Sequence, residues 1–231
     1  KTYYPGFHNI ELILKGYYTM ENFFSLDGKF FRFINKFTSL IALNFLFIIT
    51  SLPIITIGVS FYALYQTILK LSQNTESYIA RTYFFFWRKN LKQNILLWLP
   101  VMILFIFCLI NLYILPFMPE TFFRSLTLCI QFLILLLLQG FLIYAFFLPD
   151  QYRTTLKHTV KNAVILTFKY LPATFLCICI NALPVSIPIL LPKITGYVLA
   201  AFIIIGFSGI SFLHTFILQL LLKKENLFGS L

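Results

Sequence analysis

Long stretches without a charged side chain are the feature that most constrains this chain of 231 residues. Five runs contain no Lys, Arg, Asp or Glu: 37–69, 93–119, 125–149, 170–192 and 194–222. A helix needs about 20 apolar residues to cross a hydrocarbon core about 30 Å thick. Each run is long enough for that, and the chain is 60% hydrophobic with only 11% charged residues. The sequence therefore predicts an all-α, polytopic membrane protein.

The first run is too long for one crossing and short for two full ones. As one helix it would extend about 50 Å at 1.5 Å per residue. Inside it, Pro53 removes a backbone donor and Gly58 permits a reversal of the backbone. We expect Gly58 to adopt a backbone conformation that a β-branched residue cannot take without strain. We predict a helical hairpin, with a first crossing at about 36–53, a tight turn and a shorter second helix at about 58–73. The alternative is one long helix kinked at Pro53.

The distribution of basic residues separates these two interpretations, because cytoplasmic loops are enriched in Lys and Arg. With six crossings, one side receives almost all basic loop residues and the other receives only Arg124 and Lys193. With five crossings, the 70–92 cluster and the N-terminal cluster would lie on opposite sides. The sequence therefore favours a bundle of six transmembrane helices, with both termini cytoplasmic and the Pro53–Gly58 turn external.

The chain is predicted to hold a single transmembrane helical domain at 20–224, followed by a C-terminal tail at 225–231. Residues 1–19 are neither an apolar span nor a signal peptide. Met20 would be a natural start, and Lys15-Gly16 can be encoded by a purine-rich ribosome-binding sequence. Residues 1–19 are therefore a translated leader or an ordinary cytoplasmic tail.

Two basic loop segments are predicted to form cytoplasmic interfacial helices. In 77–94, basic side chains cluster on one helix face and Phe84 and Trp87 lie on the adjoining face, a pattern typical of an in-plane helix. In 150–170, basic residues recur at every fourth position, and we expect this segment to pack against the other loop. Membrane anchoring or docking of a partner would explain the basic surface. It comprises Arg81, Arg88, Lys89, Lys92, Arg153, Lys157 and Lys161.

Polar residues within the predicted crossings are few, and none is acidic. This argues against a conventional ion-coupled carrier, which commonly places an ionisable group at the midplane. His214 fits either a neutral residue hydrogen-bonded between helices or a proton relay. The amides fit either interhelical hydrogen bonds or a polar cavity. They are Asn44, Gln66, Asn111, Gln131, Gln139 and Asn181. The candidate polar path comprises Gln66, Asn111, Gln139 and His214.

No catalytic, cofactor-binding or metal-binding motif occurs in the sequence; HExxH, GxSxG, the Walker A loop and paired-Cys zinc patterns are all missing. The cysteines lie in apolar runs and are interpreted as small hydrophobic residues: Cys108, Cys129, Cys177 and Cys179. The net charge of +11 is explained by membrane topology and does not indicate nucleic-acid binding. We therefore expect no enzyme activity, no cofactor and no metal.

Several short motifs follow one another in a characteristic order. They are Asn44, Ser51–Gly58, Ala63–Tyr65, Tyr78, Arg81, Phe84–Phe85, Lys89–Asn90, Lys92–Gln93, Phe147–Pro149 and Lys161–Ala163. Together they resemble the YesL-like family of bacterial integral membrane proteins, over about 20–224. The resemblance implies a Gram-positive family of unknown biochemical activity, often encoded beside ABC-type sugar-import and polysaccharide-degradation genes. It supplies no catalytic residue.

Two functions are therefore predicted. The leading hypothesis is an accessory protein that resides in the lipid bilayer and binds an ABC-type sugar importer, or another membrane protein, through its basic surface. The alternative is a permease for a neutral solute, with the candidate polar path lining its route. A continuous polar cavity touching all four path residues would favour the permease, and a dry core would favour the accessory protein.

Overall fold

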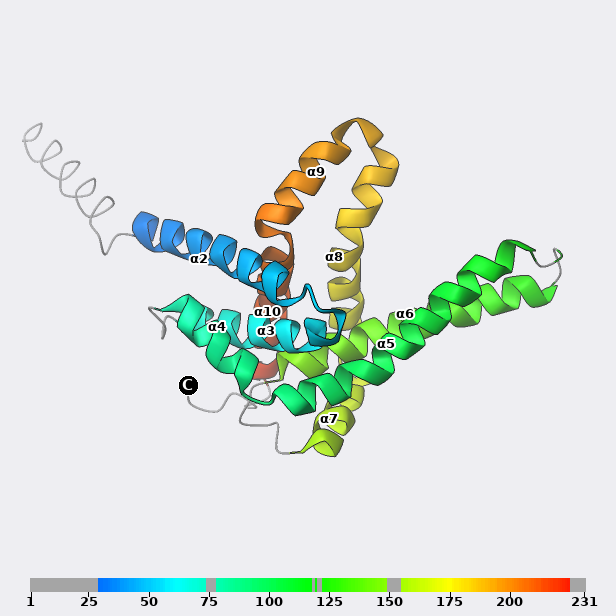
Figure 1. Ribbon diagram of the computed structural model, residues 1–231, viewed down its shortest axis with the longest axis horizontal. Coiled ribbons are helices and arrows are strands. Elements are labelled where there is room, and N and C mark those ends of the chain that lie inside the picture. The colour runs from blue at the N-terminus through cyan, green and yellow to red at the C-terminus, as the bar shows by residue number, and fades with distance from the viewer. Residues whose placement is uncertain (1–28, 74–77, 118, 120–121, 149–154, 225–231) are drawn as a thin grey trace, which may run out of the picture. The chain divides into compact units, whose positions relative to one another are not determined.

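The structure is a computed structural model that describes residues 29–73, 78–117, 119, 122–148 and 155–224. Every regular element within them is helical (Figure 1), which confirms the predicted all-α class. The chain divides into two units, Lys1–Ile41 and Ala42–Leu231. The described part of the first unit is the beginning of helix α2 (Lys29–Thr50). The predicted leader or tail at 1–19 and the tail at 225–231 lie outside the described residues.

The helices follow the predicted order of crossings and loop segments. After α2 come α3 (Ile57–Ser72), α4 (Ile79–Arg88), α5 (Leu91–Ile114), α6 (Phe122–Phe147), α7 (Leu156–Lys169), α8 (Leu171–Leu190), α9 (Thr195–Ala201) and α10 (Phe207–Lys224). The short 3₁₀ helices are η1 (Ile54–Thr56), η2 (Leu115–Phe117) and η4 (Pro192–Ile194), and a π-helical segment, η5 (Phe202–Gly206), joins α9 to α10.

Five stretches of the described residues are long and apolar enough to cross a membrane, so the chain is a multi-pass membrane protein. They are Ile54–Ser72, Leu91–Phe117, Phe122–Phe147, Leu171–Leu190 and Pro192–Leu221. They coincide with five of the six predicted crossings; the sixth falls on α2, whose apolar part, Ile34–Thr50, is shorter. The stretch containing α3 differs from the others, because 67% of it is buried, against 17% or less elsewhere. Helix α3 is therefore surrounded mainly by protein.

The chain reverses direction at Pro53, as predicted. Helix α2 ends at Thr50 and α3 begins at Ile57. The rings of Phe47 and Phe61 pack with centroids 4.7 Å apart. A continuous helix would hold these two positions about 21 Å apart. The hairpin is therefore confirmed, and the single kinked helix is excluded.

The turn between α2 and α3 lies beside α4 and near the beginning of α5. The Tyr83 hydroxyl of α4 lies 2.6 Å from Thr50 Oγ1, and Trp98 Nε1 of α5 donates to the Ile54 carbonyl at 2.9 Å. The α5–η2 stretch continues to Phe117, about 28 Å beyond Trp98 at helical rise. These contacts do not fit the predicted external turn if α4 lies at the cytoplasmic surface. On that condition the turn lies on the side of α4, although Ile54–Ser72 is long and apolar enough to cross a membrane.

A buried hydroxyl cluster fixes this position of the turn. Thr50 donates its own proton to the Leu46 carbonyl at 2.9 Å, so its oxygen accepts from Tyr83 and from Ser60, the latter at 3.0 Å. Burial raises the pKa of Tyr83 to about 12, while the hydrogen bonds with Thr50 and Ser60 oppose this shift. The phenol therefore stays protonated near neutral pH and can act as a donor.

Gly58 is required by close packing and not by its backbone conformation. The prediction of a backbone conformation closed to β-branched residues is wrong, because Gly58 lies inside α3 and no described glycine has a positive φ. A Cβ at Gly58 would lie 2.5 Å from Trp98 Cβ and 2.9 Å from Trp98 Cγ. The missing side chain is what lets α3 and α5 approach.

The helix predicted over 77–94 is interrupted at Asn90, which adopts a left-handed conformation with φ of 55°. Asn tolerates this conformation better than most residues. Helix α4 also has a buried face that the sequence analysis missed. Tyr83 and Phe86 are buried, and the Phe86 ring meets Tyr62 of α3 edge-on, with centroids 6.3 Å apart. Phe84, on the predicted aromatic face, is exposed.

Asn44 of α2 closes the irregular helical segment before α10. Its Nδ2 donates to the Ile203 carbonyl at 2.6 Å, and its Oδ1 accepts from the Ser208 backbone N–H at 3.0 Å. Residues five apart are hydrogen-bond partners in a π-helix, and Ile203 and Ser208 have this spacing. The Asn44 amide therefore bridges the carbonyl of one residue and the backbone N–H of the other. Unpaired, such groups would cost several kcal/mol each in hydrocarbon.

We expect a cysteine at Ile55 to be labelled from the same side of the membrane as one at Arg88. Ile55 is exposed in η1, and Arg88 ends α4. Single-cysteine variants without the four native cysteines would be treated with an impermeant maleimide in right-side-out and inverted vesicles. Lys193→Cys, in the α8–α9 connection, is the control for the opposite side. If Ile55→Cys is labelled together with Lys193→Cys, α3 crosses the membrane and the six-crossing topology holds.

Gly58→Ala should destabilise the folded protein, whereas Gly196→Ala should not. The added methyl group overpacks the α3–α5 contact, which typically costs about 1–3 kcal/mol. Gly196 is the matched control, because a Cβ there meets nothing within 4 Å and Ala favours its helix. Thermal unfolding of both purified variants in detergent measures the difference. Equal melting temperatures would show that the α3–α5 approach is looser than described.

Candidate functional site

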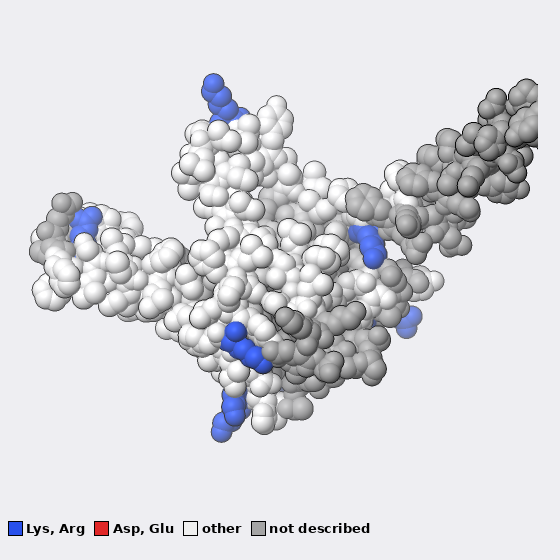
Figure 2. Space-filling model, turned by 180° about the vertical axis from the view of Figure 1, so that it is seen from behind, with Lys and Arg blue, Asp and Glu red and all other residues white. Residues whose placement is uncertain are grey.

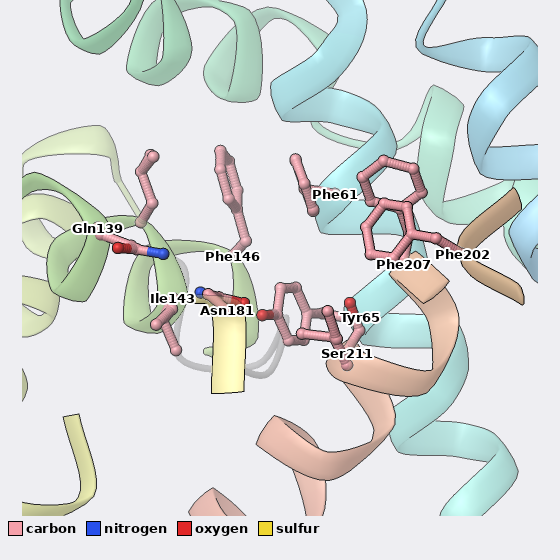
Figure 3. Close-up of a pocket in the computed structure, with 11 residues that line it drawn as sticks. Phe61, Tyr65, Gln139, Ile143, Phe146, Asn181, Phe202, Phe207 and Ser211 are labelled. Carbon is pink, nitrogen blue, oxygen red and sulfur yellow. The ribbon is translucent and has the colours of Figure 1, made fainter. Parts of the chain in front are cut away.

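A cavity of about 280 Å³ lies among α3, α6, α8, η5 and α10 (Figure 3). Its lining is mainly apolar, with four residues that carry polar groups. The lining residues are Phe61, Tyr65, Gln139, Leu142, Ile143, Phe146, Asn181, Phe202, Phe207, Ile210 and Ser211. Small-molecule sites typically have this character, an apolar wall with a few convergent polar groups. This cavity is therefore the candidate functional site.

Aromatic rings form a large part of the cavity wall. Phe61 of α3 stacks on Phe146 of α6 with centroids 6.3 Å apart, and the rings of Phe202 and Phe207 lie 4.6 Å apart. Phe47 of α2 joins the two pairs, at 4.7 Å from Phe61 and 4.8 Å from Phe207. Because the five rings support one another, this part of the wall is well packed.

Gln139 of α6 and Asn181 of α8 supply the carboxamides of the cavity. Figure 3 shows the two amide groups facing the same space, with the Tyr65 hydroxyl beyond Asn181. Both side chains are partly buried, and neither amide has a hydrogen-bond partner among the described residues. Their hydrogen-bonding capacity is therefore available at the cavity.

His214 of α10 belongs to a buried hydrogen-bonded chain behind the cavity. Its Nε2 lies 3.1 Å from the Cys177 carbonyl, and its Nδ1 lies 2.8 Å from the Tyr65 hydroxyl. A carbonyl can only accept, so Nε2 carries the proton and Nδ1 accepts from Tyr65. Both ring nitrogens are satisfied in the neutral form. This geometry fits the interhelical interpretation of His214 without requiring a proton relay.

Gln66 and Asn111 lie outside the cavity lining. Gln66 is buried, and its Nε2 donates to the Phe146 carbonyl at 3.2 Å and the Leu148 carbonyl at 3.0 Å, at the end of α6. Asn111 lies on α5 and is partly exposed. The structure thus brings Gln139 to the cavity and His214 behind it, but it does not join the four residues of the predicted path in one cavity.

The sequence analysis did not include Tyr65, Asn181 and Ser211 in the polar path. A signal for this region is nevertheless present in α10, where buried polar residues recur at helical spacing. They are Ser208, Ser211, His214 and Thr215. Such a stripe predicts the face of a helix that packs against its neighbours.

The predicted basic surface is divided among three helices. Arg81 and Arg88 are exposed on α4, Lys92 on the first turn of α5, and Lys157 and Lys161 on α7. Lys89, between α4 and α5, lies over the Phe85 ring at 5.5 Å from its centroid. Arg153 lies outside the described residues. In the view of Figure 2 the described basic side chains stand apart from one another among uncharged residues.

A hydrogen bond connects the two basic segments. Gln93 Nε2 of α5 donates to Thr159 Oγ1 of α7 at 3.1 Å. The contact between the loop segments that the sequence predicts is thus present. It places Lys92 and Lys157 on neighbouring helical turns of two packed helices.

The described residues contain no group of three or more His, Cys, Asp or Glu that could hold a metal ion. All seven acidic residues of the chain lie outside the described residues. Cys108 and Cys177 are buried, whereas Cys129 and Cys179 are exposed on helices that are candidate membrane spans.

Residues 40–112 match the model of a protein family described as "Protein of unknown function, DUF624". The match covers α3, α4, most of α5 and the second part of α2, which is less than half of the chain. No curated protein and no solved structure matches the chain. The comparison thus relates the hairpin and the first basic segment to a family without an assigned activity.

His214→Leu should destabilise the folded protein, whereas His214→Gln should largely preserve it. Leucine removes the hydrogen bonds that the imidazole makes with the Tyr65 hydroxyl and the Cys177 carbonyl, at a cost of about 1–3 kcal/mol. Glutamine can donate to the carbonyl and accept from the hydroxyl without titrating. Thermal unfolding of both variants in detergent gives the comparison. Equal destabilisation by both substitutions would contradict a purely hydrogen-bonding role for His214.

Proposed function

We propose that this multi-pass membrane protein is a non-enzymatic accessory component that binds a membrane partner through its basic segments. The observation that carries the proposal is the set of exposed cations on adjoining segments. Arg81 and Arg88 project from α4, while Lys92, Lys157 and Lys161 project from α5 and α7. No described residue is acidic, so these cations have no carboxylate partner within the described part of the chain.

The packing beneath these segments supports a role in recognition. Helix α4 is anchored by buried Tyr83 and Phe86, which leaves Arg81 and Arg88 on its exposed side. Helix α7 is linked to α5 through the hydrogen bond between Gln93 and Thr159. The cations are therefore carried by packed helices, and fixed positions favour a specific acidic partner over a purely diffuse attraction to lipid.

The cytoplasmic face of an ABC-type sugar importer is the proposed partner. The positive-inside rule supports a cytoplasmic position for the basic segments. The resemblance of the chain's motifs to YesL-like proteins supports a link to carbohydrate uptake. Both arguments start from the sequence, and the exposed cations are the structural feature that such a partner would contact.

A permease for a neutral solute is the second candidate function. The favouring observation is the cavity, where Gln139 and Asn181 have no hydrogen-bond partner among the described residues. Gln66 and Asn111 do not line it, so the cavity gives a binding site without a continuous polar route. This makes the accessory role the leading proposal.

Arg81→Gln/Arg88→Gln should lower the recovery of importer subunits with the tagged protein by about tenfold. Chemical crosslinking in native membranes followed by mass spectrometry measures this recovery. The matched control is Arg124→Gln/Lys193→Gln, which removes the same charge at the α5–α6 and α8–α9 connections. The remaining basic residues should keep the topology, which impermeant-maleimide labelling checks.

Unchanged recovery in the Arg81→Gln/Arg88→Gln variant, or no importer subunit with the native protein, would contradict the proposal. The permease would be supported instead if the purified protein, alone in proteoliposomes, lets a neutral pentose equilibrate across the membrane.

A further inference from the structure

We propose that the cavity among α3, α6, α8 and α10 is a binding site for a small neutral amphiphile. Such a molecule has an apolar chain or ring and one hydroxyl or amide head group. The cavity volume of about 280 Å³ is just below the range of about 300–1,000 Å³ for drug-sized ligands, which fits a small occupant. This inference is independent of partner binding at the basic segments.

Several carboxamides of the predicted crossings hydrogen-bond other parts of the protein. Asn44 bonds the backbone around η5, Gln66 bonds the end of α6, and Gln131 donates to the Cys108 carbonyl. Gln139, Asn181 and Asn111 have no partner among the described residues, but of these three only Gln139 and Asn181 line the cavity. Both side chains are partly buried, and each amide offers a donor and an acceptor to a molecule in the cavity. A bound head group would supply the missing partners.

The depth of these amides indicates which molecules can reach them. Gln139 lies about 12 Å before the end of α6, and Asn181 lies about 15 Å after the start of α8. In a hydrocarbon core about 30 Å thick, both are near the midplane. A ligand arriving from the surrounding lipid must therefore dissolve in hydrocarbon, which favours an amphiphile over a polyol.

The charge state of the lining favours a neutral head group. No Lys, Arg, Asp or Glu is among the described residues that line the cavity. The titratable pair nearest to it, Tyr65 and His214, is engaged in its own hydrogen bond at 2.8 Å. Burying a carboxylate or ammonium here would leave an unpaired charge at high cost. Each carboxamide offers a donor and an acceptor, so a hydroxyl or amide head can bond both.

A photoactivatable long-chain alcohol and the matching alkane are the probes for this proposal. Both would carry the same diazirine and be added to the full-length protein in lipid nanodiscs, and mass spectrometry would map the attachment sites. We expect saturable labelling of peptides around Phe146 and Phe202 by the alcohol. The alkane should label these peptides at least tenfold less at equal concentration.

Substitution of the cavity amides should weaken labelling by the alcohol only. Asn181→Leu and Gln139→Leu should each raise the half-saturating alcohol concentration about fivefold, as expected for one hydrogen bond. Asn111→Leu is the control, because it removes another amide of the predicted crossings outside the cavity. Thermal unfolding of ligand-free protein should show Asn181→Leu to be at least as stable as the native chain, because the amide has no described partner to lose.

Equal labelling by alkane and alcohol would overturn the proposal, since the cavity would then simply collect acyl chains. Unchanged labelling in both cavity variants, or labelling confined to the outer surfaces of α5 and α6, would also overturn it. Because importer recovery is not involved, these outcomes are separate from those that test the accessory role.

Discussion

A peptide group in hydrocarbon has no water to bond, so each interruption of a membrane helix needs a partner from the protein. Three interruptions in this chain receive one from a side chain on another helix. Trp98 bonds the Ile54 carbonyl at the turn, Asn44 bonds the groups around η5, and Gln66 bonds the carbonyls at the end of α6. These contacts hold the breaks where they are and therefore also fix which helix faces meet.

The same constraint explains why the cavity amides stand out. An amide that closes a backbone break has a structural reason to be in the membrane, and Asn44 and Gln66 have that reason. Gln139 and Asn181 contact no backbone break in the described residues. They lie instead beside a wall of packed aromatic rings, where directional hydrogen bonds and apolar contact can act on one small molecule. Amides that bond a backbone break belong to the scaffold, whereas the two available amides that also line the cavity belong to the candidate site.

Much of the fold can be predicted from the sequence, because the features that determine it can be read directly along the chain. Charge-free runs locate the spans, and Pro53 locates the reversal between α2 and α3. The sequence does not give the contacts that depend on helix rotation. Gly58 was expected to serve the turn through its backbone, whereas it makes room for Trp98. The buried face of α4 was missed because Tyr83 and Phe86 can lie in an interface or in a core. For the same reason, Gln139 and Asn181 could both be named from the sequence as intramembrane amides, but the sequence could not show that these two share one cavity.

The number of crossings illustrates a limit of charge counting. The distribution of Lys and Arg indicates on which side of the membrane each loop lies. A hairpin that crosses the membrane twice returns the chain to its starting side, and so does a hairpin that does not cross at all. The loops that follow lie on the same side in both cases. The basic bias that excluded five crossings is therefore equally compatible with six or with four. Length and apolarity do not decide between them, since a helix that is apolar all round is either a membrane span or a core helix.

The residues that contact the turn between α2 and α3 indicate on which side of the membrane the turn lies. Thr50 and Ser60 meet Tyr83, on the helix that also bears Arg81 and Arg88. Helix α3 is thus a buried layer between α4 and the cavity: its Tyr62 packs on Phe86 of α4, while its Tyr65 lines the cavity.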